Sequence, residues 1–289
     1  MKKIFAVLLV LLMLIPLVAE ETEEKKHWEN KGQTSFQFAQ AAFKNWASGG
    51  TNALSLNTLL TYYINYTHDK LSWKNNFEIG YGFQYALQTM QKTDDKIDYS
   101  TSLDFTAGKN WDYSGALSFK TQMTKGFDGA TLISNFFAPA YVVVSGGMTY
   151  APSDDLNILI SPVTGKMTFV TDPILSAAGS YGVDPDETFR AELGGFVKMS
   201  LKYELLENVL MSTKLELFSN YVDNPQFVDV NWDLLIAMKI NKYLSANIAT
   251  NLVYDHDIDI EHENAQGVVV TGPVVQFKEM FSLGLTFIL

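Results

Sequence analysis

Charged side chains recur at every second position in segments that are otherwise built from apolar residues. The complete set is Arg190, Glu192, Lys198, Lys202, Lys214, Glu216, Asp229, Asp233, Asp104 and Lys120. If these side chains share one interior, two kinds of chemistry are open to them. They could form a charged constriction that selects solutes. They could instead neutralise one another as ion pairs in a filled polar core, because a bare buried charge is costly. The sequence favours neither.

A second group of carboxylates lies in the acidic run 255–263. Asp255, Asp257, Asp259 and Glu261 alternate along it. Carboxylates on one face of a strand could bind a hard divalent cation or, through that cation, lipopolysaccharide. Their spacing is not that of a known calcium loop, so a solvated outer loop is the favoured interpretation. We expect no resident metal and no other cofactor.

The histidines are the candidates for general-base chemistry. There are four, His27, His68, His256 and His262. A hydrolase of the serine type needs a histidine beside a serine and a carboxylate. Here the histidines fall in a tail, in a turn and in the acidic run, and no nucleophile-elbow motif occurs. We therefore expect no catalytic residues and no enzyme activity.

The elements that carry the charged set are expected to be β-strands, because apolar and polar residues alternate with a period of two. Segment 71–86 shows this pattern most clearly, with Trp73, Phe77 and Ile79 on one face and Lys74 and Glu78 on the other. About twelve such segments (10–14) follow one another, each close to the ~9–11 residues that a tilted membrane strand needs. The sequence predicts an all-β fold, a transmembrane antiparallel up-and-down β-barrel with the charged face inside. One strand is expected to kink near Pro162.

The connections between these segments fall into two alternating sets. The short ones are 67–70, 109–112, 151–154, 205–207 and 241–242, and the long ones include 88–98, 126–138, 171–187 and 255–272. Outer-membrane barrels have short turns at the periplasm and longer loops outside. The pattern predicts an even strand number with both ends of the barrel chain at the periplasmic side.

The last segment carries its own signal. Phe277, Phe281, Leu285 and Phe287 share one face of an alternating strand at the end of the sequence. A membrane barrel needs its last strand to pair with its first, since that pairing removes both open edges. We expect Phe281–Leu289 to be the segment that the barrel-assembly machinery reads.

The remaining sequence features indicate where the protein is located and exclude several classes of site and partner. Residues 1–19, with Lys2, Lys3 and an apolar stretch before Ala19, predict a cleaved signal peptide. Residues 20–32 are expected to form a periplasmic tail and residues 33–289 the barrel. The absence of cysteine excludes a disulfide framework, a thiolate metal site and a cysteine nucleophile. A net charge of −11 argues against nucleic acid as a partner.

Several short motifs together resemble one family. They are Asn45–Asn52 (NWASGGTN), Trp73-Lys74-Asn75 followed by Tyr81-Gly82, Lys92–Asp95 (KTDD) and Phe119–Gln122 (FKTQ). The chain is similar, from about Trp28 to its C-terminus, to an uncharacterised set of Bacteroidetes outer-membrane β-barrel proteins known as domain of unknown function 3078. The resemblance implies the outer membrane of a Gram-negative bacterium. It supplies no catalytic residues.

These observations lead to one expected function and two alternatives. The leading expectation is a monomeric or weakly oligomeric barrel that lets small solutes pass passively through a narrow polar lumen. The main alternative is a structural or interaction barrel with a closed lumen, whose loops bind a partner. A barrel-embedded hydrolase is a distant third. The expected surroundings are outer-membrane lipid and lipopolysaccharide.

Overall fold

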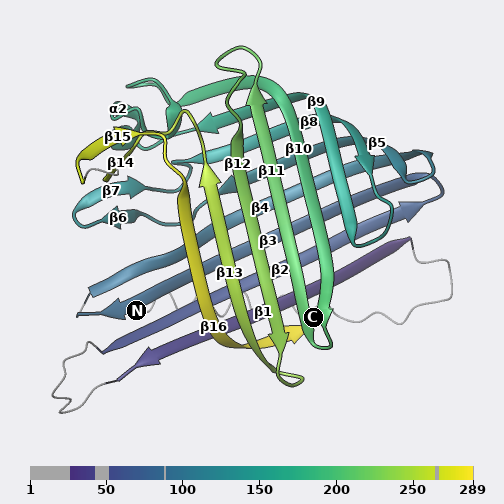
Figure 1. Ribbon diagram of the computed structural model, residues 1–289, viewed down its shortest axis with the longest axis horizontal. Coiled ribbons are helices and arrows are strands. Elements are labelled where there is room, and N and C mark those ends of the chain that lie inside the picture. Colours follow the sequence, from purple (N-terminus) through teal and green to yellow (C-terminus); the bar gives the residue numbers. More distant parts are fainter. Residues whose placement is uncertain (1–26, 43–51, 88, 264–266, 289) are drawn as a thin grey trace.

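The computed structural model describes residues 27–42, 52–87, 89–263 and 267–288. Within these residues twelve antiparallel strands form a closed barrel in the order β1-β16-β13-β12-β11-β10-β9-β8-β5-β4-β3-β2 (Figure 1). The barrel strands are β1 (Trp28–Ala41), β2 (Ala53–His68), β3 (Leu71–Ala86), β4 (Thr89–Gly108), β5 (Trp111–Thr121), β8 (Ala140–Tyr150), β9 (Leu156–Phe169), β10 (Phe189–Leu206), β11 (Val209–Asn220), β12 (Asp229–Lys239), β13 (Leu244–Tyr254) and β16 (Gln276–Ile288). The predicted fold and strand number are confirmed. The predicted signal peptide 1–19 lies outside the described residues.

The barrel is apolar outside and polar inside. Large apolar side chains such as Leu103, Phe105 and Leu193 are about half exposed on its outer face. The most deeply buried residues include small polar ones, among them Ser161 and Thr164. In water the exposed apolar face would be unfavourable. In a bilayer the apolar face contacts lipid, and the polar interior is kept away from it. The fold is therefore that of a transmembrane β-barrel. Among the described residues no helix is long and apolar enough to cross a membrane.

The first and last strands close the barrel, as the C-terminal pattern predicts. β16 pairs with β1 from Gln33↔Ile288 to Phe38↔Leu283, and on its other edge with β13. Phe281 and Leu285 point outward, at 64% and 45% exposure. Both ends of the barrel chain lie at the end with the short turns.

The two ends of the barrel differ. Short turns join β2 to β3, β4 to β5, β8 to β9, β10 to β11 and β12 to β13. The opposite end carries the helix α2 (Pro173–Ala177), the 3-10 turn η1 (Ser180–Gly182) and two hairpins, β6 (Gly126–Asp128) with β7 (Thr131–Ser134) and β14 (Ile260–Glu263) with β15 (Val269–Gly272). Figure 1 shows α2 and both hairpins gathered beyond the same end of the strands. We refer to this as the loop end.

Two predicted boundaries differ from the structure. β1 begins at Trp28, so residues 28–32 are strand rather than tail, because they pair with Tyr66–Tyr62 of β2 beyond the apolar part of β1. Likewise residues 89–98, predicted as a loop, extend β4 and pair with β3 up to Ala86↔Thr89. Both stretches are polar on both faces, so the alternation that reveals a strand in lipid is absent there.

The predicted kink in β9 is present. The pairing with β8 passes from Gly146↔Val163 to Met148↔Ile160, so Ser161 and Pro162 are inserted opposite a single residue, Gly147. A Cβ on Gly147 would lie 2.0 Å from the Ile160 carbonyl oxygen, which explains the glycine. After the bulge, residues that uninterrupted alternation would place on the lipid face point into the lumen, and the others point outward.

Candidate functional site: the charged lumen

All ten residues predicted to line the lumen lie on the inward face of barrel strands. Nine of them divide into a central group, a group near the loop end and a group near the short turns, and the tenth, Asp233 on β12, accepts a hydrogen bond from Asn251 Nδ2 at 2.7 Å. The structure adds partners that the sequence did not assign to the set.

The central cluster, defined as Asp98, Lys120, Lys198, Lys214 and Glu216, is built around one carboxylate. Glu216 on β11 lies 2.6 Å from Lys120 Nζ and 3.4 Å from the Nζ atoms of Lys198 and Lys214. Lys214 Nζ also lies 3.5 Å from Asp98 on β4. At 3.4 Å the two longer contacts act through Coulomb attraction rather than as short aligned hydrogen bonds.

Two of these ion pairs, Lys120–Glu216 and Lys214–Asp98, cross the lumen, whereas Lys198 lies directly opposite Glu216 on the neighbouring strand. β5, which carries Lys120, and β11, which carries Glu216, are separated around the wall by β8, β9 and β10. β4 and β11, joined by Asp98 and Lys214, lie one strand further apart. The lysine side chains are 22–26% exposed, so space for water remains beside them. The carboxylates are less exposed, 12% for Glu216 and 16% for Asp98.

A second set, the outer cluster, centres on Lys166 of β9. Its Nζ lies 2.7 Å from Asp229, 3.2 Å from Asp255 and 3.6 Å from Glu192. The Lys166 side chain is only 12% exposed, so it needs this negative surrounding to remain charged. The contacts bring β9, β10, β12 and the end of β13 together.

Arg190 extends the outer cluster towards the loops. Its Nη2 lies 3.3 Å from Glu192 and 2.5 Å from Asp257, and its Nη1 donates to the Gly182 carbonyl at 3.1 Å. A cavity of about 400 Å³, lined by acidic residues and Arg190, opens beside these contacts. Arg190 thus ties the barrel wall to two loops.

Two carboxylates of the acidic run 255–263, which the sequence offers as a weak metal-site candidate, form ion pairs with lumen cations. Asp255 and Asp257 neutralise Lys166 and Arg190, whereas Asp259 and Glu261 are exposed. In the part of the chain that the structure describes, no group of acidic and histidine residues is arranged to hold a metal ion.

The group near the short turns is more open. Lys202 Nζ lies 5.4 Å from the centre of the Tyr63 ring, and their strands, β10 and β2, are six places apart around the wall. Lys74 pairs with the buried Asp104 at 3.0 Å, and Asp104 accepts a hydrogen bond from Ser114 at 2.7 Å. In all three groups, charged or polar contacts therefore cross the lumen or lie along its wall.

An apolar cluster also occupies part of the interior. Leu159, Phe196 and Phe218 are buried together, and Ala116 packs against them. Lys166 Nζ lies 5.1 Å from the centre of the Phe218 ring. The cluster lies between the central and outer charge clusters.

Above the barrel, two loops pack into a small cap. Its buried residues are Ala138, Val170, Leu175 and Val183, with Leu132 and Tyr181 against them. The Tyr181 hydroxyl donates to the Ile133 carbonyl, and burial raises the pKa of Tyr181 to about 12. The cap gives the loop end an ordered structure of its own.

Asp172 anchors this cap. Its Oδ2 accepts from Asn135 Nδ2 at 2.8 Å, and its Oδ1 accepts from the Ile174 amide at 2.9 Å and the Leu175 amide at 3.4 Å. The Asn135 hydrogen bond, followed by the amides of α2, holds the pKa of Asp172 below its usual value. The carboxylate thus caps α2 and links it to the neighbouring loop.

Sequence reasoning missed several charges of the lumen. Lys166 was hidden by the β9 bulge, and restarting the alternation after Pro162 would have placed it inside. Lys96 pairs with Glu78, and Lys92 with Asp95 at 2.9 Å. These lysines lie in the stretch predicted as a loop, so no inward face was assigned to them.

The histidines contact one another, aromatic rings and backbone carbonyl oxygens, and His68 Nε2 also lies 3.5 Å from Asp69. His27 and His68 contact each other at 3.4 Å, and His27 Nδ1 lies 3.0 Å from the Thr67 carbonyl oxygen. His256 stacks on Phe227, and His262 Nδ1 lies 2.9 Å from the Ile260 carbonyl oxygen.

Comparison with known proteins gives structural likeness at low identity. No curated protein matches the sequence. The translocator domain of the autotransporter NalP from Neisseria meningitidis is 10% identical, with a TM-score of 0.38, over 92% of this chain and 89% of that one. The COG4313 outer membrane channel from Pseudomonas putida F1 is 12% identical, with a TM-score of 0.40, over 93% and 99%. The Pseudomonas putida toluene transporter TodX is 6% identical, with a TM-score of 0.28, over 92% and 89%.

The family resemblance drawn from the short motifs is confirmed for one part of the chain. That part runs from near the end of β1 through β5 into β6, and it includes all four motifs in full. Residues 38–127 match the family described as Protein of unknown function (DUF3078).

Proposed function

We propose that the protein is an outer-membrane β-barrel whose narrow, charged lumen passes small polar solutes or ions. The observation that carries this proposal is the central cluster, in which hydrated ion pairs from β4, β5, β10 and β11 meet across the lumen. Charged side chains of both signs at a constriction select what passes and can exchange partners with permeating ions.

Partial exposure of the lysines supports a passage rather than a solid core. A buried ion pair in a dry core is rigid, whereas one in contact with water is weaker and can open. Free small ions can compete for each partner in a hydrated pair. The passage is narrow, because a lysine from one strand meets a carboxylate from a distant strand across it.

The test is single-channel conductance of the purified full chain in a planar bilayer. We expect wild-type protein to give small, reproducible steps that grow with salt concentration. Lys214→Ala removes a side chain that reaches Asp98 across the lumen, so it should raise the conductance about twofold or more and shift ion preference toward cations.

The matched control is Lys242→Ala, which removes the same charge from an exposed turn between β12 and β13. It should leave conductance and ion preference unchanged. Silence of both wild type and Lys214→Ala, with folding verified by a heat-dependent shift on a gel, would contradict the channel.

A second candidate is an interaction barrel with a closed lumen, and the packed cap at the loop end favours it. The cap has its own buried core and an anchored helix, which pure connecting loops do not need. Under this alternative the lumen clusters serve only to hold the wall together, and a silent bilayer trace is expected.

Three further statements belong to the proposal. The barrel lies in the outer membrane of a Gram-negative bacterium after cleavage of residues 1–19, with lipid and lipopolysaccharide around its apolar face. The segment Phe281–Leu289 is read during assembly. The protein has no enzyme activity, and lipid or peptide cleavage by the refolded chain would contradict this.

A further inference from the structure

The seam between β1 and β16 is paired over only part of its length. Six residue pairs join these strands, ending at Phe38↔Leu283, whereas β1 pairs with β2 through Ala41 and β16 pairs with β13 through Gln276. Above the last pair, residues 39–41 of β1 and 276–282 of β16 have no partner across this seam among the described strands. We call this part of the wall the side opening.

The burial pattern changes at the same place. Elsewhere in these strands exposed and less exposed residues tend to alternate, as expected for a wall with lipid on one face and the lumen on the other. Residues 39–41 are all exposed, and so are residues 275–279. The lumen-facing positions of these two stretches, such as Ala39 and Lys278, are therefore accessible, whereas Ser282 next to the paired part stays buried.

An unpaired strand edge is costly in a membrane. Every backbone N–H and C=O that faces hydrocarbon must find a partner, which is why spanning barrels are closed. Opposite the described residues 39–41, β16 has no strand partner, so the backbone groups of both strands there need polar groups supplied by water or by a ligand. A site at this edge would satisfy that need.

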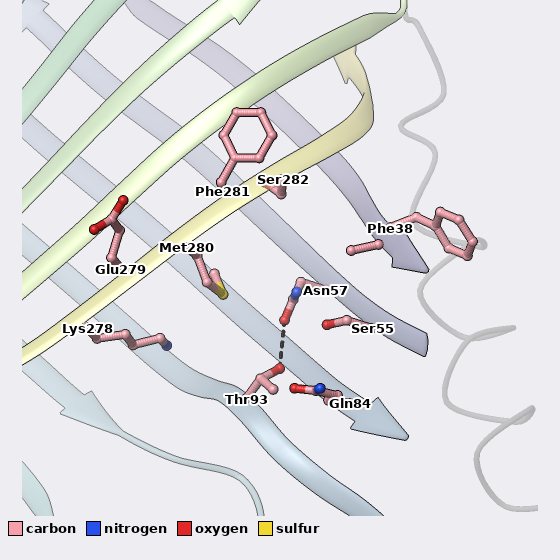
Figure 2. A pocket seen from close by; sticks show the side chains of 11 residues that line it. Phe38, Ser55, Asn57, Gln84, Thr93, Lys278, Glu279, Met280, Phe281 and Ser282 are labelled. Carbon is pink, nitrogen blue, oxygen red and sulfur yellow. Dashed lines mark hydrogen bonds between the residues drawn. The ribbon is translucent and has the colours of Figure 1, made fainter. Parts of the chain in front are cut away.

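A cavity lies at the side opening. It measures about 360 Å³, at the lower end of the range for small-molecule sites. Ser55, Asn57, Gln84 and Thr93 form its polar inner side, and Phe38 and Phe281 lie on the lipid side. Figure 2 shows Phe281 on one side of β16 and Met280 on the other, towards Asn57 and Thr93.

Two charged residues, Lys278 and Glu279, line the cavity, and the cation is already paired. Lys278 Nζ lies 3.0 Å from Asp94 Oδ1, so this cation has a carboxylate partner within the chain. The remaining inner groups are hydroxyls and amides, and the Thr93 hydroxyl donates to Asn57 Oδ1 at 2.9 Å. Neutral donors and acceptors suit an uncharged polar headgroup better than an anion.

We propose that the side opening binds a single-chain amphiphile with a small uncharged headgroup, such as a monoacylglycerol. The headgroup lies among Ser55, Asn57, Gln84 and Thr93 and supplies hydrogen bonds to the free edge of β16. The acyl chain leaves between Phe38 and Phe281 into the bilayer. This site opens to the membrane and does not depend on conduction through the lumen.

The test uses the refolded full chain in phosphatidylcholine vesicles with a monoacylglycerol that carries a photoreactive diazirine on its acyl chain. After irradiation, mass spectrometry locates the labelled residues. We expect saturable labelling at Phe38 and Phe281, competed by unlabelled monoacylglycerol, and weak labelling at Phe105, which is half exposed on the lipid face of β4.

Variants separate the site from general lipid contact. Asn57→Leu with Gln84→Leu removes two neutral headgroup partners and should lower labelling at Phe38 and Phe281 at least about fivefold. The matched control, Gln37→Leu, changes an inward glutamine in the paired part of β1 and should leave labelling unchanged.

Three results would overturn the proposal. They are equal labelling of Phe38, Phe281 and Phe105, labelling that unlabelled monoacylglycerol does not reduce, and stronger competition by a fatty acid, which would show an anion site instead. Competition by unlabelled monoacylglycerol in the wild-type protein tests the proposal even if the double variant fails to fold.

Discussion

Glu216 neutralises three lysines that come from three different strands. Its carboxylate lies 2.6 Å from Lys120 and 3.4 Å from Lys198 and Lys214. Without it, three like charges would face one another in a space narrowed by protein, where repulsion is stronger than in water. One residue therefore sets the charge balance of the whole constriction.

The stability that the Asp172 carboxylate contributes to α2 depends on pH. Its pKa lies below its usual value because Asn135 and the α2 amides bind the ionised form. A carboxylate with a depressed folded pKa contributes stability that is full above its unfolded pKa of ~4 and is lost as pH falls through the folded pKa. We expect exchange protection of the Ile174 and Leu175 amides to be constant above pH ~4 and to fall below it.

The measurement is hydrogen exchange of residues 172–178, corrected for the intrinsic effect of pH. Asp172→Ala should lose protection above pH ~4 by an amount equivalent to about 0.5–2 kcal/mol of capping energy and should approach wild type as pH falls below the folded pKa of Asp172. Asp154→Ala, in the short turn between β8 and β9, is the control and should not alter protection in α2. Unchanged protection in Asp172→Ala would show that the cap does not depend on this carboxylate.

At the scale of elements, the sequence predicts strands well where lipid contact imposes alternation. The strand β3, with Trp73 and Phe77 outside and Lys74 inside, can be predicted from its own sequence alone. The lower part of β1 and the upper part of β4 leave the apolar zone, so their polar residues carry no such signal. Their pairing is set by the neighbouring strands, which a single segment does not reveal.

The candidate site is predictable to a similar extent. Alternation places Lys120, Lys214 and Glu216 on the inward face, but it does not say which of them meet. Those contacts depend on strand order and stagger around the closed wall, as in the pairing of Lys214 with Asp98 on distant β4. The side opening is a property of the β1–β16 register and carries no local sequence pattern.

The β9 bulge leads to a prediction at this scale. Deleting Pro162 removes one inserted residue, so the second half of β9 must shift by one position and turn Lys166 toward lipid. A lysine facing lipid near the loop end costs only about 0–1 kcal/mol, so the larger loss is that of its contacts with Asp229 and Asp255 in the buried outer cluster. We expect the deletion to abolish folding, measured as loss of the heat-dependent gel shift.

Pro162→Ala is the matched control for that deletion. It keeps the number of residues in the bulge, and the carbonyl that accepts from the Tyr221 hydroxyl at 3.0 Å is retained. This variant should fold with a midpoint close to that of wild type. A deletion variant that folds equally well would mean that the bulge does not set the register of β9.

At the scale of the whole molecule, the barrel has two chemically different ends. The short-turn end holds the aromatic pair Trp111 and Tyr150, whose ring centres are 4.9 Å apart, as favoured at a membrane–water boundary. The loop end holds the cap, the hairpins and the outer cluster. If assembly follows the rule for outer-membrane barrels, the loop end faces the outside of the cell.

The absence of cysteine makes this orientation directly measurable, because any introduced thiol is unique. Ile174→Cys in α2 and Val222→Cys in the loop between β11 and β12 are 66% and 81% exposed at the loop end, while Asp69→Cys lies in an exposed turn at the other end. A membrane-impermeant maleimide added to intact cells should label the first two within minutes. It should label Asp69→Cys only after the outer membrane is permeabilised, because that thiol lies in the periplasm. Labelling in the reverse order would place the cap inside the cell envelope, and equal labelling of all three would show that the barrel does not separate two compartments.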